Sequence, residues 1–264
     1  IIERKYETAK TRIPEVQLLS NRSYSVMISN SGSGYSKRGK QYIYRWRNDS
    51  VEENKGMFFY IKDLSNNKWW SAGYEPCQSE GDYYEAVFSE NKAKFKRQDG
   101  NIITSTTVCV SSEEDAEIRR LAITNKGKTD KILEVTSYME ITIAPFDADL
   151  VHPAFSNLFV RTEFNGEYGC LLASRRRRSE KENECWIMHH MIVDGETEGN
   201  TEYETSRVNF IGRTRDVHNP EAINSPLKNT AGDVLDPVMS LRRRIKIKPG
   251  KTVRVSYITA AADS

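Results

Sequence analysis

Short apolar runs separated by turn signals are the feature that most limits what this chain can fold into. No segment keeps helical periodicity over three turns, whereas alternation with a period of two recurs along the chain. The clearest case is Lys92–Lys96, where lysine and apolar residues alternate before the turn signal Asp99-Gly100 and the β-prone run Ile102–Val110. This pattern predicts a β-hairpin with one buried face.

More than a dozen such runs follow one another, so we expect an all-β fold, a large antiparallel β-sandwich. The apolar phase slips between Ile118 and Leu121, which suggests a β-bulge near Arg119-Arg120. No low-complexity linker divides residues 14–264, and we interpret them as a single domain. Residues 1–13 are basic and polar and are interpreted as the remnant of a linker.

Charge and hydropathy exclude several classes of partner. The 39 basic and 37 acidic residues give a net charge of +2, which provides no general attraction to nucleic acid or anionic membrane. No apolar run is long enough to span a bilayer, and no signal peptide is visible. The start at Ile1 favours an excised segment. We expect a cytoplasmic protein without direct membrane contact, although a parent protein could be attached to the inner membrane.

The cysteines favour free thiols. Cys77, Cys109, Cys170 and Cys185 are irregularly spaced and form no Cys-x-x-Cys pair. This argues against a zinc site or a redox dithiol and fits a reducing compartment. A disulfide between Cys170 and Cys185 across a hairpin stays open.

One stretch combines turn chemistry with ligand-binding side chains. Ser29–Ser36 follows the strand-like run Tyr24–Ile28 and contains Gly32 and Gly34, which permit positive φ and close approach of another group. Arg45–Arg47 then places a flat Trp ring between two planar cations. Trp faces can stack on sugar rings, and Arg forks bind hydroxyls, carboxylates or phosphate. The alternative is a Gly-Ser hairpin with an exposed Trp.

Several blocks in order resemble one family. The chain is similar to the N-terminal β-sandwich of glycoside hydrolase family 94, formerly glycosyltransferase family 36, and most of all to its cyclic β-1,2-glucan synthetase branch. The resemblance covers nearly the whole chain. The blocks that carry it are Ser20–Met27, Asn30–Ser36, Tyr44–Asp49, Trp70–Pro76, His152–Ser156 and Leu235–Arg244.

The resemblance implies a galactose-mutarotase-like super-sandwich that precedes a catalytic (α/α)6 barrel, which would follow residue 264. Catalytic residues and phosphate-binding residues lie in that barrel in the family, so we expect no catalytic residue, no metal and no cofactor here. The parent could use inorganic phosphate as co-substrate. The domain would pack on the barrel and contribute a loop to a β-glucoside or β-glucan site, in its own subunit or in a homodimer partner. The expected substrate-binding residues are Ser33, Gly34, Tyr35, Arg45, Trp46 and Arg47.

Other functions stay open. The chain could be an independent β-glucan-binding module with Trp46 or Trp70 as the platform, or a purely structural or dimerising domain. A mutarotase-like epimerase ranks last, because no strand presents a recognisable His and Glu pair for acid and base chemistry.

The remaining polar motifs favour structural roles. His189 and His190 are adjacent on a strand, so one should face the core and they cannot share a metal. Trp69 and Trp70 should likewise face opposite ways. We expect Arg175–Arg178 to form a solvated hairpin tip. Alternation from Leu241 to Ile247 places Arg243 on the apolar face, where it pairs with an internal Asp or Glu unless a bulge turns it outward, and an internal ion pair is favoured over a ligand. His152 is expected to brace its loop.

Overall fold

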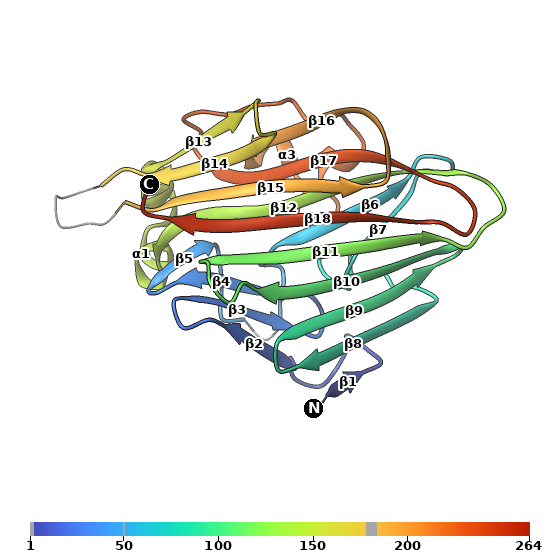
Figure 1. Cartoon of the computed structure of the whole chain (residues 1–264). Coiled ribbons are helices and arrows are strands. Elements are labelled where there is room, and N and C mark those ends of the chain that lie inside the picture. The colour runs from blue at the N-terminus through green and yellow to red at the C-terminus, as the bar shows by residue number, and fades with distance from the viewer. Residues whose placement is uncertain (1–2, 50, 178–183) are drawn as a thin grey trace.

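The all-β prediction is confirmed. The computed structural model describes residues 3–49, 51–177 and 184–264, and these residues form two antiparallel sheets of nine strands each (Figure 1). One large apolar cluster draws side chains from both sheets and fills the space between them. The molecule is therefore a β-sandwich whose core lies between the layers.

The first sheet has the strand order β1-β8-β9-β10-β11-β18-β15-β14-β13. The predicted hairpin is confirmed, since Ile102 lies opposite Asp99 and Val108 opposite Ala93. The strands of this sheet are β1 (Arg4–Tyr6), β8 (Tyr83–Ser89), β9 (Lys92–Asp99), β10 (Ile102–Val110), β11 (Ala116–Asn125), β13 (Val160–Asn165), β14 (Cys170–Arg175), β15 (Trp186–Asp194) and β18 (Thr252–Ala262).

The second sheet runs β16-β17-β12-β5-β4-β3-β2, with β6 paired to β12 and β7 to β6. Its strands are β2 (Val16–Ser20), β3 (Tyr24–Ser29), β4 (Gly34–Arg38), β5 (Gln41–Tyr44), β6 (Phe58–Asp63), β7 (Lys68–Ser71), β12 (Lys131–Pro145), β16 (Glu196–Ser206) and β17 (Pro237–Ile247). The register between β12 and β5 shifts after Ile141, and Ile143 takes a positive φ of 47°. Pairing resumes at Ala144 and Pro145, directly before the first helix, so the shift is a local irregularity of the β-bulge kind.

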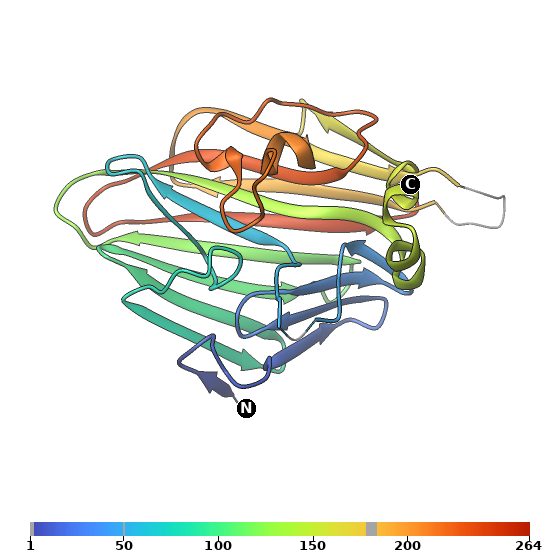
Figure 2. The ribbon, with the colours of Figure 1, turned by 180° about the vertical axis from the view of Figure 1, so that it is seen from behind.

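Two short helical elements, α3 (Arg207–Ile211) and the 3₁₀ turn η1 (Glu221–Ile223), lie over the outer face of the second sheet, and α1 (Phe146–Val151) and α2 (Pro153–Asn157) lie at one end of the sandwich (Figure 2). A second apolar cluster lies beneath α3 and η1, where Tyr138 of β12 stacks on Phe210 with ring centroids 4.5 Å apart. Strand β12 is therefore buried on both faces. None of the described helices has the length and apolarity needed to cross a membrane.

The predicted bulge at Arg119-Arg120 is wrong. Strand β11 pairs without interruption with both β10 and β18. The alternation of apolar residues along β11 is interrupted because Glu117 and Arg119 face the core. They form an ion pair there, with Arg119 Nε 2.7 Å from Glu117 Oε2. Charged side chains thus occupy positions that alternation assigns to apolar ones, and the strand needs no extra residue.

The first residues belong partly to the sheet. Arg4–Tyr6 forms the edge strand β1, with Lys5 opposite Val87 of β8. Tyr6 also packs on Phe88 with ring centroids 5.6 Å apart. Backbone pairing and an aromatic contact thus hold this part of the segment that was interpreted as a linker remnant, and that interpretation stays a prediction. The boundaries of a single domain over 14–264 stay a prediction.

The adjacent histidines face opposite ways, as predicted. His189 is fully buried and lies 2.9 Å from Ser137 Oγ and from Thr259 Oγ1, whereas His190 is half-buried. Burial lowers the pKa of His189 to about 3, so this side chain is neutral at pH 7. Among the described residues, no three His, Cys, Asp or Glu side chains gather as metal ligands would.

The expected internal ion pair of Arg243 is wrong. Arg243 is half-buried and donates to Thr197 Oγ1 at 3.0 Å, with no carboxylate partner among the described residues. The internal arginine is its neighbour Arg242, which is 2% exposed and faces the other side of β17. Arg242 donates to Thr136 Oγ1 at 2.8 Å and lies 3.4 Å from Glu202. The alternating pattern does not identify Arg242 as buried, because it assumes one buried face and β17 is covered on both faces.

Candidate functional site

The glycine turn forms the frame of the candidate site. Gly34 adopts a φ of 156°, and a Cβ there would lie 1.9 Å from the carbonyl oxygen of Met27, so only glycine fits. Ser33 is fully buried, and its hydroxyl donates to the carbonyl of Lys55 at 2.7 Å. The structure therefore places both residues inside the fold, where they hold the turn and present no free group to a ligand.

Tyr35 lies at the surface in a row of half-buried aromatic rings. Its ring centroid is 5.7 Å from that of Trp46 and 5.1 Å from that of Tyr42, and Tyr42 lies 5.7 Å from Phe146 of α1. We call these four residues the aromatic edge. Lys37 places its Nζ 5.7 Å from the Tyr35 centroid. The edge offers ring faces, hydroxyls and one cation, which is a chemistry suited to sugars.

Arg45 is not a free ligand-binding fork. Its side chain is only 10% exposed and donates to Glu140 Oε2 at 2.8 Å, to Asn157 Oδ1 at 2.9 Å and to Asp149 at 3.2 Å. Arg47, 27% exposed, reaches the other oxygen of Asp149 at 2.6 Å. The two arginines thus hold Asp149 of α1 between them, and Arg47 alone keeps part of its guanidinium at the surface.

Glu140 is the centre of this arrangement. Besides Arg45, it accepts from Lys55 Nζ at 3.0 Å and from Arg207 Nε at 3.1 Å. We call Glu140, Arg45, Lys55, Asp149 and Arg207 the Glu140 network. Burial by itself would raise the pKa of Glu140, but the attraction of the three cations is stronger. The net effect lowers the pKa of Glu140 to about 2. The stability it contributes is therefore complete above its unfolded pKa of about 4.3 and is lost as pH falls towards 2.

The ionisation of Glu140 decides what the network can do. Glycoside hydrolysis needs a carboxylic acid that holds its proton near neutral pH, and Glu140 is shifted the opposite way. Burial raises the pKa of Glu75 to about 7. That side chain lines a small space of about 20 Å³, which has room for a water molecule and not for a sugar ring. Glu140 therefore stays ionised at neutral pH, where its carboxylate holds the cations around it.

The network also anchors elements that carry exposed apolar side chains. Asn157 of α2 donates to Asp236 Oδ1 at 3.0 Å, and Arg207 of α3 lies 3.5 Å from Asp236 Oδ2. The elements joined in this way expose five aliphatic residues, each between 48% and 79% accessible. We call them the apolar rim: Leu150, Val151, Leu158, Val208 and Leu235.

Glu140, Lys55 and Asp149 were not predicted as site residues from the sequence. Glu140 lies 95 residues from Arg45 in the chain, and no local pattern connects them. One signal was present, because a carboxylate within the long strand β12 needs a partner if the strand is covered on both faces. Of the predicted arginine run, Arg176 and Arg177 are exposed and pair with Asp233 at 3.7 Å and Glu184 at 3.2 Å. Arg178 lies outside the described residues.

The match to a family model decides the family. The model of the glycosyl hydrolase 94 supersandwich domain matches residues 1–264. The chain belongs to this family. Among curated relatives, this supersandwich domain is 37% identical over 94% of its length to the cyclic β-(1,2)-glucan synthase NdvB of Rhizobium meliloti. It is 21% identical over 97% of its length to the N,N'-diacetylchitobiose phosphorylase of Vibrio furnissii.

Solved structures agree on the fold. This supersandwich domain aligns over 95% of its length with a putative aldose 1-epimerase of Escherichia coli, at a TM-score of 0.50 and 10% identity. It aligns over its full length with a bacterial glucoamylase, at a TM-score of 0.53 and 7% identity, and covers 36% of that chain. The domain spans 9% of the glucan synthase and 32% of the chitobiose phosphorylase.

Proposed function

We propose that this supersandwich domain is the non-catalytic partner of a helical (α/α)6 catalytic barrel in a protein that transfers glucosyl units, to phosphate or to a growing β-glucan. The relatives include a cyclic β-glucan synthase and a disaccharide phosphorylase, and the domain spans only a part of each. The domain packs on the barrel through the apolar rim. It contributes the aromatic edge to a glucoside site of the same subunit or of a dimer partner.

The single observation that carries this proposal is the apolar rim beside the Glu140 network. Leu150, Val151 and Val208 lie on short helices, and Leu158 and Leu235 on the loops beside them. A cluster of exposed aliphatic side chains is typical of a surface that contacts another protein. These helices are held by ion pairs whose members are buried, such as Glu140 with 5% and Asp149 with 6% side-chain exposure. The rim is thus fixed before contact, which lowers the entropy cost of docking.

The aromatic edge adjoins the rim, because Phe146 opens α1 and packs on Tyr42. Trp46 supplies a ring face, Tyr35 a hydroxyl and Arg47 a partly exposed fork. Burial raises the pKa of Tyr35, so its hydroxyl stays protonated at pH 7. A glucoside held between the domain and a barrel would meet these groups, which can bind it through ring contacts and hydrogen bonds.

Trp46→Ala in the complete natural polypeptide is expected to raise KM for the glucoside about tenfold, the effect of losing one ring-stacking contact. kcat should stay nearly unchanged, because the stacking acts equally in the ground state and the transition state. Trp186→Ala is the matched control, since Trp186 is half-buried on β15 of the other sheet. Equal kinetics for the two variants would refute a glucoside role for the edge.

A further inference from the structure

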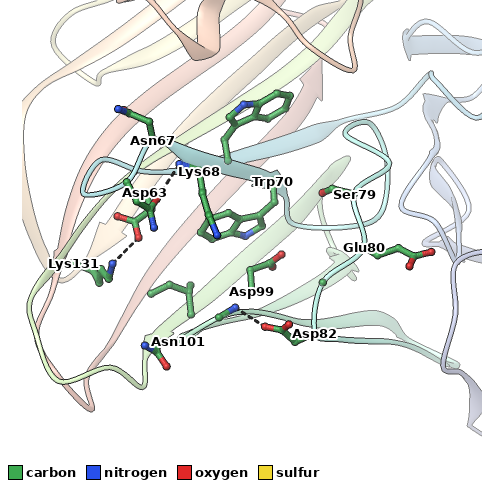
Figure 3. Close-up of a pocket in the computed structure, with 15 residues that line it drawn as sticks. Asp63, Asn67, Lys68, Trp70, Ser79, Glu80, Asp82, Asp99, Asn101 and Lys131 are labelled. Carbon is green, nitrogen blue, oxygen red and sulfur yellow. Dashed lines mark hydrogen bonds and ion pairs between the residues drawn. The ribbon is translucent and has the colours of Figure 1, made fainter.

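An open pocket of about 590 Å³ lies at the end of the sandwich opposite α1 (Figure 1). Its walls come from the turn between β6 and β7, the turn between β9 and β10, the loop 79–82 and Lys131 at the start of β12. Figure 3 shows the ring of Trp70 between β7 and Asp99, at the floor of this space. We call it the Trp70 pocket.

The walls of the Trp70 pocket are fixed from behind. Arg97 is 1% exposed and donates to Asp99 through two hydrogen bonds of 2.7 Å. The same guanidinium donates to the carbonyl of Ser79 at 2.9 Å and so holds the loop 79–82. Asp82 Oδ2 accepts from the backbone N–H of Gly100 at 2.7 Å, which joins that loop to the β9–β10 turn. The cavity is therefore formed without a ligand.

The indole N–H of Trp70, at the floor of the pocket, makes no hydrogen bond to any described residue. The side chain is 5% exposed, and its Nε1–H is buried. A buried N–H without an acceptor carries a desolvation cost that a ligand oxygen would relieve. On the rim, the exposed side chains of Asn67, Lys68 and Asn101 also lack partners within the described part of the chain.

The charges around the pocket cancel. Four carboxylates line it: Asp63, Glu80, Asp82 and Asp99. Lys131 lies 2.7 Å from Asp63, Arg97 holds Asp99, Lys10 pairs with Glu80, and Lys68 stands free on the rim. A pocket with balanced charge, an aromatic floor and a mixture of donors and acceptors suits a neutral polyhydroxylated ligand better than an ion.

We propose that the Trp70 pocket binds a neutral hexose unit of a glycan, with the indole of Trp70 at its floor and Asn101 contacting the sugar from the rim. The volume is in the range of small-ligand pockets. This site does not depend on the proposed role of the aromatic edge, because the two lie at opposite ends of the sandwich. It would hold a glycan segment away from the edge.

The test uses the indole N–H resonances of the ¹⁵N-labelled chain, whose four tryptophans give four signals assigned by single Trp→Phe variants. Titration with a neutral β-linked glucose disaccharide should shift the Trp70 signal, saturating with a Kd of order millimolar. Asn101→Ala should weaken binding about tenfold, as for the loss of one hydrogen bond. Asn91→Ala is the matched control, because Asn91 is an exposed asparagine in the β8–β9 turn. This variant should bind the sugar as tightly as the unchanged chain.

Three outcomes would overturn the proposal. The Trp70 signal could stay fixed with every neutral sugar. It could respond only to calcium chloride or to a sugar phosphate, which would mark the pocket as an ion site. The sugar could shift the Trp46 signal alone, which would place binding at the aromatic edge and leave the proposed function standing. Assignment survives failure of Trp70→Phe to fold, because the other three signals identify the fourth by elimination.

Discussion

Arg119→Met is expected to lower the free energy of unfolding by about 3–5 kcal/mol, the cost of leaving a buried charge without its partner. Glu117 is fully buried and Arg119 is 2% exposed. The guanidinium also donates to Tyr44 Oη at 2.8 Å and to the carbonyl of Met57 at 3.1 Å. Glu117 and Tyr44 raise the pKa of Arg119 against the lowering effect of burial. Equilibrium unfolding in urea measures the loss.

Two comparisons make the Arg119 prediction specific. Arg254→Met removes an ion pair whose members are 52% and 75% exposed, and should cost less than about 1 kcal/mol. Adding Glu117→Gln to Arg119→Met should recover part of the stability, because the remaining group is then neutral. A loss below about 1 kcal/mol for Arg119→Met alone would mean that water reaches Glu117.

Arg45→Ala is expected to cost about 3 kcal/mol and to loosen α1. The variant removes one of the cations that neutralise Glu140 and one of the two arginines that hold Asp149. The pKa of Glu140 should rise, so the acid limb of the stability curve should move to higher pH. Urea unfolding between pH 3 and pH 7 measures both effects, and tryptophan fluorescence reports the environment of Trp46.

Arg47→Ala is the comparison for Arg45→Ala. Arg47 is 27% exposed and contacts only Asp149 among the acids of the Glu140 network, so its loss should cost about 1 kcal/mol. It should leave the acid limb in place, because Glu140 keeps its three cations. Equal losses for the two variants would contradict the view that Arg45 is structural and Arg47 is partly available to a ligand.

The sandwich was predictable because its signals are local. A strand that buries one face repeats every two residues, and a turn such as Asp99-Gly100 is encoded by its own residues. Lys92–Lys96 and Ile102–Val110 therefore paired as expected. The resemblance to glycoside hydrolase family 94 rested on ordered blocks and was confirmed by the family match over the whole chain.

Buried charges were harder to foresee, because most of the groups around them are distant in the chain. The alternation around Arg119 predicts a bulge, whereas the side chain is buried by pairing with Glu117 and by donating to Tyr44, which lies 75 residues away. The sequence predicts that Arg45 binds a ligand, whereas in the fold its guanidinium pairs with Asp149, which is 104 residues away. The residue types that recognise a sugar are the same types that build internal ion networks, and only the fold distinguishes the two uses.

Trp46 and Tyr35 are the predicted site residues whose rings lie at the surface, and Arg47 keeps part of its fork there. Their role in binding stays a prediction. Ser33 and Gly34 belong to the frame, because the turn that was expected to face a ligand packs against residues 55 and 73–75 instead. Sequence motifs predict the candidate residues, and burial divides these residues between frame and surface.

Hydrogen–deuterium exchange of the α1–α2 segment, residues 146–158, tests the central claim most directly. It compares the complete natural polypeptide with the 264-residue chain under the same conditions. Docking of the apolar rim on a catalytic barrel predicts slower exchange of these amides in the complete polypeptide, because contact suppresses local opening. The β9–β10 hairpin, far from the rim, should exchange equally in both. Equal exchange of residues 146–158 in the two proteins would contradict the account.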